Sequence, residues 1–303
     1  MMNKRLVVVA GPTAVGKTKM AIDIANHFHT EIISCDARQF YREMLIGTAK
    51  PDAQELQQAR HHFIDTHSIH DEYDAGKFAL DVDRLLPSLF KSHDVVVMTG
   101  GSGLYIQAVC DGLDEMPEAA HDQREALQAL YLKTGLTPLL DELSKSDPTY
   151  FEQVDRNNPQ RIIRALEVIR STGKPFSSYR KGQNKKQHEF EVIKIALKMD
   201  MTVLYERIDR RMDLMIAKGL FEEAIRLLPY QHLNALQTVG YREIFSYLGG
   251  EYDEKQAVRL LKRNSRRYAK RQMTWLRRDK EFEWFNHDQY DAIIQHIDRR
   301  GVT

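Results

Sequence analysis

One short segment constrains the fold of this chain more than any other. Residues 11–18 match the pattern G-x-x-x-x-G-K-[ST] in full, and they follow the apolar run Arg5 to Ala10. Apolar residues then recur at helical spacing, so the segment connects a buried strand to the start of a helix. Backbone N–H groups and the positive end of that helix can surround an anion. We therefore expect a phosphate-binding P-loop that consists of Gly11, Pro12, Thr13, Ala14, Val15, Gly16, Lys17 and Thr18.

Other apolar runs predict the sheet to which this loop belongs. Short runs at Glu31 to Cys35, Asp94 to Thr99 and Phe190 to Leu197 are typical of buried strands. Helical patterns separate them, and the pattern from Thr202 to Leu228 is interrupted near Gly219. Strands that alternate with helices form a parallel sheet covered on both faces. The predicted fold class is α/β, a P-loop parallel sheet flanked by helices.

A middle segment departs from this alternation. Residues 114–189 contain helical patterns and several prolines but no convincing strand, and the exit at residues 181–187 is polar and loop-like. We expect a small all-helical domain at 114–189, inserted into a P-loop core of residues 1–113 and 190–303. The core would include the basic helices near the C-terminus.

Composition excludes several classes of protein. The 303 residues are 42% hydrophobic and 29% charged, as in ordinary globular proteins. No apolar run approaches the roughly 18 residues of a membrane span, and the N-terminus lacks the features of a signal peptide. Two cysteines, Cys35 and Cys110, form neither a disulfide framework nor a zinc set. We expect a cytoplasmic protein without membrane contacts, and nothing in the sequence demands more than a monomer.

The net charge is only +1, but the positive charge is unevenly distributed. Residues 259–278 hold nine Lys or Arg residues and no acidic residue. A solvated helix face would explain this block equally well. The interleaved Tyr268, Met273 and Trp275 favour nucleic-acid binding, because rings can stack on bases beside cations that bind phosphates.

Three polar segments follow the carboxyl ends of predicted strands. They are the P-loop, Asp36 and the turn Gly100 to Tyr105, and ligands of parallel sheets bind at that edge. We expect one cleft in which Lys17 supplies positive charge and the Thr18 hydroxyl completes a Mg²⁺ shell. Asp36 could be the metal ligand of an NTPase or serve another role, whereas Asp94 begins its strand and faces the opposite edge. Together these groups favour group transfer over simple binding.

At this point seven segments, in order, resemble the bacterial tRNA dimethylallyltransferase (tRNA isopentenyltransferase) family. The resemblance covers about residues 5–285, and its segments are residues 11–18, 34–51, 61–65, 100–105, 158–168, 238–243 and 269–275. One departure is Ala37, where the family usually has Ser after the acid. Asp36 and Gln39 keep the rest of that D-S-x-Q pattern.

The resemblance implies an alkyl transfer. The dimethylallyl group of dimethylallyl diphosphate would pass to the exocyclic N6 amine of an adenosine next to the anticodon, with release of diphosphate. We assign Asp36 as the general base for the amine, which is a poor nucleophile. Lys17, Mg²⁺ at Thr18 and Arg211 would neutralise the leaving diphosphate, and Ser102 would donate a hydrogen bond nearby.

Helical spacing and the family match together indicate a position for Arg211. We expect it on the helix Thr202 to Lys218, on the face opposite Leu204, Ile208 and Met215. Without the resemblance it could equally be a solvated arginine beside Arg207 and Arg210. The stripe of Met212, Met215 and Ile216 is expected to be core.

The resemblance also implies contacts with the tRNA anticodon stem-loop. A helix capped by Asn158 and ended by Gly173 would bury Ile162 and direct Arg161 outward. An ion pair, for example with Glu167, is the alternative for such an arginine. The predicted tRNA-binding residues are Asp36, Ala37, Arg38, Gln39, Ser102, Arg124, Gln160, Arg161, Ile162, Ile163 and Arg164.

Three other functions stay open at this stage. An isopentenyltransferase of free adenine nucleotides would need neither the insertion nor the basic helix. A P-loop kinase of small molecules is favoured by the P-loop alone. A nucleic-acid-binding ATPase would leave Asp36 and the Gly100 turn without a role.

His61 and His62 are adjacent but lack a third ligand nearby, so we expect packing or hydrogen bonding there, not a metal site.

Overall fold

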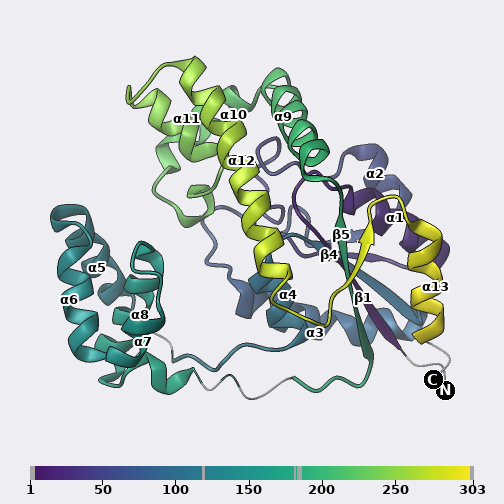
Figure 1. The fold of residues 1–303 in the computed structure, drawn as a ribbon, viewed down its shortest axis with the longest axis horizontal. Helices are drawn as coiled ribbons and strands as arrows, with labels where there is room; N and C mark the ends of the chain where they lie inside the picture. The colour runs from purple at the N-terminus through teal and green to yellow at the C-terminus, as the bar shows by residue number, and fades with distance from the viewer. Residues whose placement is uncertain (1–3, 118–119, 181, 183–185, 301–303) are drawn as a thin grey trace. The chain divides into compact units, whose positions relative to one another are not determined.

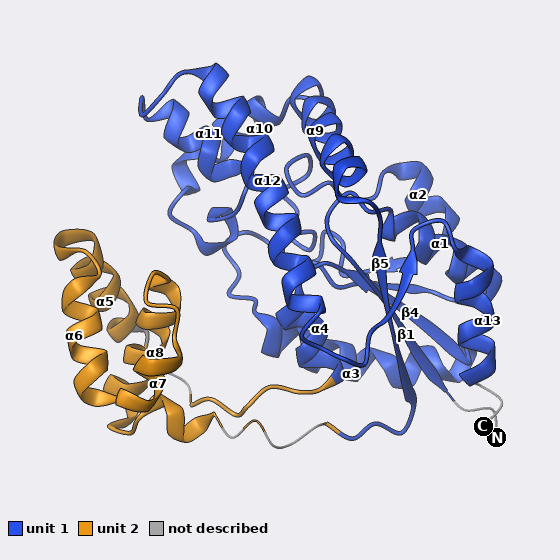
Figure 2. Cartoon of the chain, in the orientation of Figure 1, with its two compact units in different colours: residues 1–110, 187–303 blue, residues 111–186 orange. Residues whose placement is uncertain are grey.

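The computed structural model describes residues 4–117, 120–180, 182 and 186–300 (Figure 1). Much of the predicted exit loop, at positions 181 and 183–185, therefore lies outside the described residues. The chain forms two compact units, residues 1–110 with 187–303 and residues 111–186 (Figure 2). The predicted insertion, 114–189, begins and ends three residues later in the chain than the smaller unit, 111–186. Each unit is described separately below.

The larger unit contains a parallel sheet, which confirms the predicted α/β fold class. Its order is β3-β2-β4-β1-β5-β6, and every neighbouring pair is parallel. The strands are β1 (Arg5–Ala10), β2 (Ile32–Ser34), β3 (His61–His62), β4 (Val95–Gly100), β5 (Glu191–Lys198) and β6 (Glu283–Asn286). Strands β3 and β6 were not predicted. The first has only two residues, and the second lies at the sheet edge, where half-exposed side chains replace an apolar run.

Both faces of the sheet are buried, as the alternation along β1 illustrates. Leu6 and Val8 belong to one apolar cluster, whereas Val7 and Val9 belong to another on the opposite face. Helices α3 (Ala75–Ser92) and α4 (Gly103–Cys110) cover the first face. Helices α1 (Lys17–His27) and α13 (Tyr290–Arg300) cover the second (Figure 1). The sheet is thereby enclosed, and its polar ligands can approach only from an edge.

Further helices extend beyond the carboxyl edge of the sheet. They are α2 (Ala53–Gln58), α9 (Met201–Ala217), α10 (Leu220–Leu227), α11 (Tyr241–Leu248) and α12 (Glu254–Leu276). The break between α9 and α10 falls at Gly219, as predicted, and Gly219 has a φ of 98°. Helices α9 and α12 lie side by side and are joined by the ion pairs Lys262–Asp213 (2.6 Å) and Arg266–Asp209 (2.5 Å).

The long helix α12 contains most of the basic block. Two of its cations, Lys262 and Arg266, are held in the ion pairs with α9. Met273 is buried, and the ring of Trp275 packs against Gly103, so neither is free to stack on a base. Of the three residues that favoured nucleic-acid stacking, only Tyr268 lines a cavity.

The smaller unit is all-helical in its described residues. It comprises α5 (His121–Thr134), α6 (Thr137–Ser146), α7 (Pro148–Gln153) and α8 (Pro159–Thr172) around a separate apolar core. Helix α8 begins at the Asn158 cap, whose side chain accepts from the Arg161 N–H (3.3 Å), and it ends at Gly173. Buried Asp147 caps α7 and accepts from the N–H (2.7 Å) and hydroxyl (2.8 Å) of Ser177, which ties the unit together.

None of the described helices is both long and apolar enough to cross a bilayer. Cys35 and Cys110 are buried free thiols.

Candidate active site

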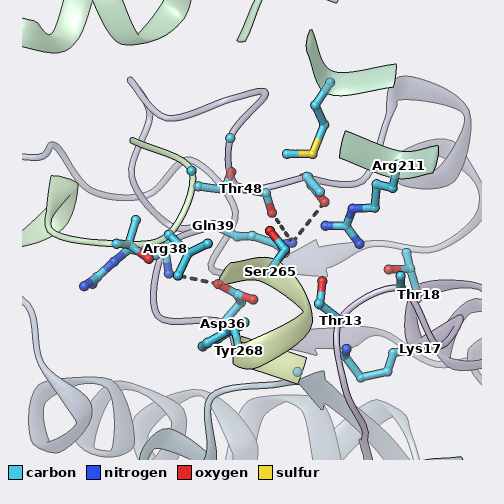
Figure 3. Close-up of a pocket in the computed structure, with 18 of the residues that line it drawn as sticks. Thr13, Lys17, Thr18, Asp36, Arg38, Gln39, Thr48, Arg211, Ser265 and Tyr268 are labelled. Carbon is cyan, nitrogen blue, oxygen red and sulfur yellow. Dashed lines mark hydrogen bonds between the residues drawn. The ribbon is translucent and has the colours of Figure 1, made fainter. Parts of the chain in front are cut away.

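A cavity of about 160 Å³ opens at the carboxyl edge of the sheet. It brings together the P-loop after β1, Asp36 after β2 and Gly100 at the end of β4. Helix α9 contributes Arg211 to its wall, and α12 contributes Tyr268. Figure 3 shows Lys17, Thr18 and Arg211 on one side of this cavity and Asp36 on the other. The segments that the sequence analysis assigned to one cleft therefore do meet.

The P-loop has the backbone conformation of an anion cradle. Gly16 is the N-cap that precedes α1, and its φ of 107° is a value that residues with side chains rarely adopt. The loop directs the Lys17 side chain back over itself, where its ammonium group donates to the Pro12 carbonyl (2.9 Å). Burial, with a smaller effect of Arg211, lowers the pKa of Lys17 to about 8, although Asp36 opposes the shift. A bound anion would stabilise the charged ammonium form of Lys17 and so oppose the effect of burial on its pKa.

Arg211 lies on a different face of α9 from the one predicted. It lines the cavity together with Ile208 and Met215, whereas the prediction placed it opposite them. The spacing explains the correction, because residues three and four positions apart share one face of a helix. Met212 also lines the cavity, so the predicted core stripe has a second role.

Arg211 has an unusual environment for a cation. Burial lowers the pKa of its guanidinium group, and Asp36 partly opposes this shift. Within the described ranges of the chain, its side chain makes no hydrogen bond or ion pair. Arg207 and Arg210 are exposed, so the solvated alternative fits them and not Arg211. A half-buried arginine that lines a cavity without a partner indicates a site for an anionic ligand.

The turn that bears Asp36 is fixed by one local and one long-range hydrogen bond. An Asp36 carboxylate oxygen accepts from the Arg38 N–H (3.0 Å), and the Ala37 N–H donates to Ser102 Oγ (2.9 Å). Ser102 therefore holds the turn in place and is not itself among the cavity-lining residues. Ala37 occupies the position of the usual family serine, and its backbone N–H makes this contact regardless of the missing hydroxyl.

Gln39 and Arg38 support the wall of the cavity. The Gln39 amide donates to the carbonyls of Thr48 (3.3 Å) and Ala49 (3.2 Å), and its oxygen accepts from Ser34 Oγ (3.1 Å). The Arg38 guanidinium donates to the carbonyls of Ala37 (2.9 Å) and Asn234 (3.2 Å). Both side chains line the cavity while these contacts hold them.

The predicted tRNA residues of the insertion divide into two groups. Gln160 and Arg161 are exposed at the start of α8, and Arg124 on α5 is half-buried. Ile162 and Ile163 are buried in the core of the smaller unit, so their side chains cannot contact RNA there. Arg164 forms an ion pair with Glu167 (3.1 Å), which is the expected alternative to a contact with tRNA. Of the predicted tRNA-binding residues of the insertion, Gln160, Arg161 and Arg124 therefore remain candidates for side-chain contacts with RNA.

The adjacent histidines hydrogen-bond within the protein. His62 Nε2 lies 2.5 Å from a Glu31 carboxylate oxygen, and His61 Nδ1 lies 2.8 Å from the Ala59 carbonyl. His61 also lines the cavity. Among the residues placed by the structure, no three His, Cys, Asp or Glu side chains form a metal-binding group.

Several residues of the site were not identified from the sequence. They are Thr48, Thr238, Gly240, Ser265 and Gln272, all of which line the cavity. A signal existed on α12, because Ser265, Tyr268 and Gln272 are uncharged residues at helical spacing within a basic block. Burial, with the charge of Asp36 adding to it, raises the pKa of Tyr268 to about 12.

The site belongs to a P-loop protein equipped for group transfer. At the edge of a parallel sheet, a small cavity holds a carboxylate and two cations that form no ion pair in the part of the chain that the structure describes. The model of one family, IPP transferase, matches residues 39–279. That match covers most of the chain, and the chain belongs to this family.

Individual relatives agree with the family match. The chain is 48% identical to a tRNA dimethylallyltransferase of Christiangramia forsetii, over 97% of both chains. It is 46% identical to tRNA dimethylallyltransferase 2 of Parabacteroides distasonis, over 98% of this chain and 99% of that one. A solved structure of tRNA isopentenylpyrophosphate transferase from Bacillus halodurans is similar at a TM-score of 0.70 and 36% identity. That similarity covers 98% of this chain and 95% of the other.

Proposed function

We propose that this protein transfers the dimethylallyl group of dimethylallyl diphosphate to the N6 amine of an adenosine next to the anticodon of tRNA. Diphosphate is the other product. The observation that carries the proposal is that Lys17 and Arg211, which form no ion pair among the described residues, line the same cavity as Asp36. The names of the relatives support the choice of donor and acceptor.

The diphosphate would bind between the P-loop and α9. Backbone N–H groups at the start of α1 favour an anion, and Lys17 and Arg211 would neutralise its charge. The Thr18 side chain lines the same cavity, and its hydroxyl oxygen is the protein group that would help to hold a Mg²⁺ ion there. When bound, Mg²⁺ would add positive charge beside the leaving group.

The remaining residues would carry out the transfer. The N6 nitrogen attacks C1 of the dimethylallyl group, and the electrons of the C1–O bond pass to the leaving diphosphate. Asp36 accepts the proton that the amine loses, while Lys17 and Arg211 stabilise the charge that develops on the diphosphate. Ile208, Met212 and Met215 offer an apolar wall for the five-carbon group and keep water from it.

The surface of the insertion supports a large acceptor. The insertion presents exposed Gln160 and Arg161 at the start of α8, and half-buried Arg124 on α5. An adenosine in a single-stranded loop can leave its stack at a cost of a few kcal/mol and enter the cavity. A tRNA acceptor would also place the enzyme in the cytoplasm, where it would act as a monomer.

One assay separates this function from its rivals. The protein is incubated with radiolabelled dimethylallyl diphosphate and Mg²⁺, and with either unmodified tRNA or AMP as the acceptor. We expect label in tRNA only. Label in AMP only would favour the enzyme of free nucleotides, and label in neither acceptor would overturn the transferase proposal. ATP in place of the prenyl donor should be neither consumed nor hydrolysed, and its consumption would favour a kinase or ATPase.

A further inference from the structure

Gln272 of α12 makes an unassigned contact between two parts of the site. Its side chain is buried, with 7% of the residue exposed. The amide oxygen accepts from the Thr13 N–H of the P-loop (2.8 Å), and the amide nitrogen donates to the Gly101 carbonyl after β4 (2.9 Å). One side chain thus bridges the turns that follow β1 and β4.

The fit of α12 onto the second turn is close. A Cβ atom at Gly101 would lie 2.2 Å from the Gln272 amide nitrogen, and one at Gly103 would lie 2.2 Å from the Trp275 ring. Contacts this short do not occur between real side chains and Cβ atoms, so a side chain at Gly101 would displace the Gln272 amide and one at Gly103 would displace the Trp275 ring. Gln272 and Trp275 are three residues apart and therefore share one face of α12.

The bridge continues toward the general base. Gly101 is followed by Ser102, whose hydroxyl oxygen accepts from the Ala37 N–H (2.9 Å), and Ala37 follows Asp36. A continuous path of covalent and hydrogen bonds therefore joins the phosphate cradle, Gln272 and the turn that bears Asp36. No other side chain among the described residues is hydrogen-bonded to both the P-loop and the turn after β4.

We propose that Gln272 is a positioning residue that fixes the distance between the diphosphate cradle and Asp36. This inference rests on the proposed function, because it assigns the cradle to the leaving group and Asp36 to the attacking amine. The Thr13 N–H is satisfied by Gln272 before any substrate binds, which makes the loop rigid in advance. Alignment of the two reacting ends matters greatly, since a displacement of about 1 Å can cost about 100-fold in rate.

The test compares two substitutions at Gln272 with a matched control. Gln272→Met keeps the length of the side chain and removes both hydrogen bonds. Gln272→Glu keeps the acceptor for the Thr13 N–H but, as a carboxylate, cannot donate to Gly101. Gln256→Met makes the same change on the first turn of α12, where the side chain has no hydrogen bond in the described structure.

The measurements are single-turnover transfer at saturating dimethylallyl diphosphate and tRNA, the Kd for tRNA, and thermal unfolding. We expect Gln272→Met to slow transfer by about 10- to 100-fold, with an unchanged Kd for tRNA and a folded protein at the assay temperature. Gln272→Glu should also be slowed, and Gln256→Met should match the unsubstituted enzyme. A merely structural role would lower the unfolding temperature of the variants and leave the rate of the folded fraction unchanged.

Failure of the inference can be told apart from failure of the proposed function. Full transfer rates in both Gln272 variants, with normal transfer by the unsubstituted enzyme, would overturn the positioning role alone. If the unsubstituted enzyme transfers no label to tRNA, the proposed function itself fails. A Gln272→Met protein that does not fold leaves Gln272→Glu to decide, because that variant keeps one of the two contacts.

Discussion

At the scale of single residues, the site is defined by charges that the protein does not neutralise itself. Lys17 has only the Pro12 carbonyl as a hydrogen-bond partner within the described residues, and Arg211 has none there. Burial lowers the pKa of both side chains, and an anionic ligand would stabilise the charged form of each. Burial of these two charges costs free energy in the protein without a ligand, and a bound diphosphate would offset that cost.

The pKa of Lys17 gives a prediction for pH dependence. Its pKa of about 8 means that the ammonium form dominates below this pH and the neutral amine above it. Since only the charged form attracts diphosphate, the KM for dimethylallyl diphosphate should rise as the pH increases through about 8. Steady-state kinetics from pH 7 to 9.5 would measure this rise.

A substitution at the same position provides the control. Lys17→Arg should abolish the rise in KM, because arginine stays charged throughout this pH range. A KM of the unsubstituted enzyme that stays constant from pH 7 to 9.5 would contradict the assigned role of Lys17.

At the scale of elements, helices beyond the sheet hold the loops that form the cavity. Buried Glu223 of α10 accepts from the backbone N–H groups of Leu45 (3.1 Å), Ile46 (2.8 Å) and Gly47 (2.9 Å). It also accepts from the Tyr241 hydroxyl of α11 (2.6 Å). The cavity wall at residues 47–49 therefore depends on a carboxylate that has no place in the proposed chemistry.

Neutralising this carboxylate should destabilise the fold. In Glu223→Gln the charge-assisted hydrogen bonds become neutral, and the new NH₂ group faces donors. We expect a loss of about 2–3 kcal/mol in the free energy of unfolding, measured by urea denaturation. Exposed Glu222 provides the matched control, and Glu222→Gln should change stability by less than about 0.5 kcal/mol. Equal effects of the two substitutions would show that Glu223 does not hold the loop.

The sequence predicted some elements of the site much better than others. The P-loop and the strand before Asp36 were predictable because local pattern determines them, through an apolar run followed by a turn of fixed composition. Strands β3 and β6 were missed, because pairing with neighbours defines them and their own composition does not. The bridge by Gln272 depends on how α12 docks on a turn about 170 residues away, and no local pattern encodes such a contact.

At the scale of the whole molecule, the chain combines an α/β unit that contains the cavity with a helical unit that has its own core. The cavity beside the P-loop is lined by residues of the α/β unit, and the helical unit exposes Gln160 and Arg161. Its internal ties, such as Asp147 to Ser177, are independent of the α/β unit.

Arg161 tests whether the smaller unit binds RNA. Arg161→Gln should weaken tRNA binding and reduce the slope of log Kd against log salt concentration by about one, as expected for the loss of one phosphate contact. Lys174→Gln removes one exposed charge beyond the other end of α8 and should leave the slope unchanged. Filter binding at several salt concentrations would measure both. The same slope in the Arg161 variant and the unsubstituted protein would return this arginine to the role of a solvated surface residue.

The central claim is that Asp36 accepts the proton of the attacking amine while the P-loop holds the leaving diphosphate. Asp36→Asn keeps the shape of the side chain, and its amide still offers an oxygen to the Arg38 N–H, but it cannot act as a base. Single-turnover transfer from dimethylallyl diphosphate to tRNA should then fall by about 100- to 10,000-fold, with the Kd values for tRNA and inorganic diphosphate unchanged. A parallel loss of tRNA binding, or a variant that transfers at the normal rate, would contradict the account.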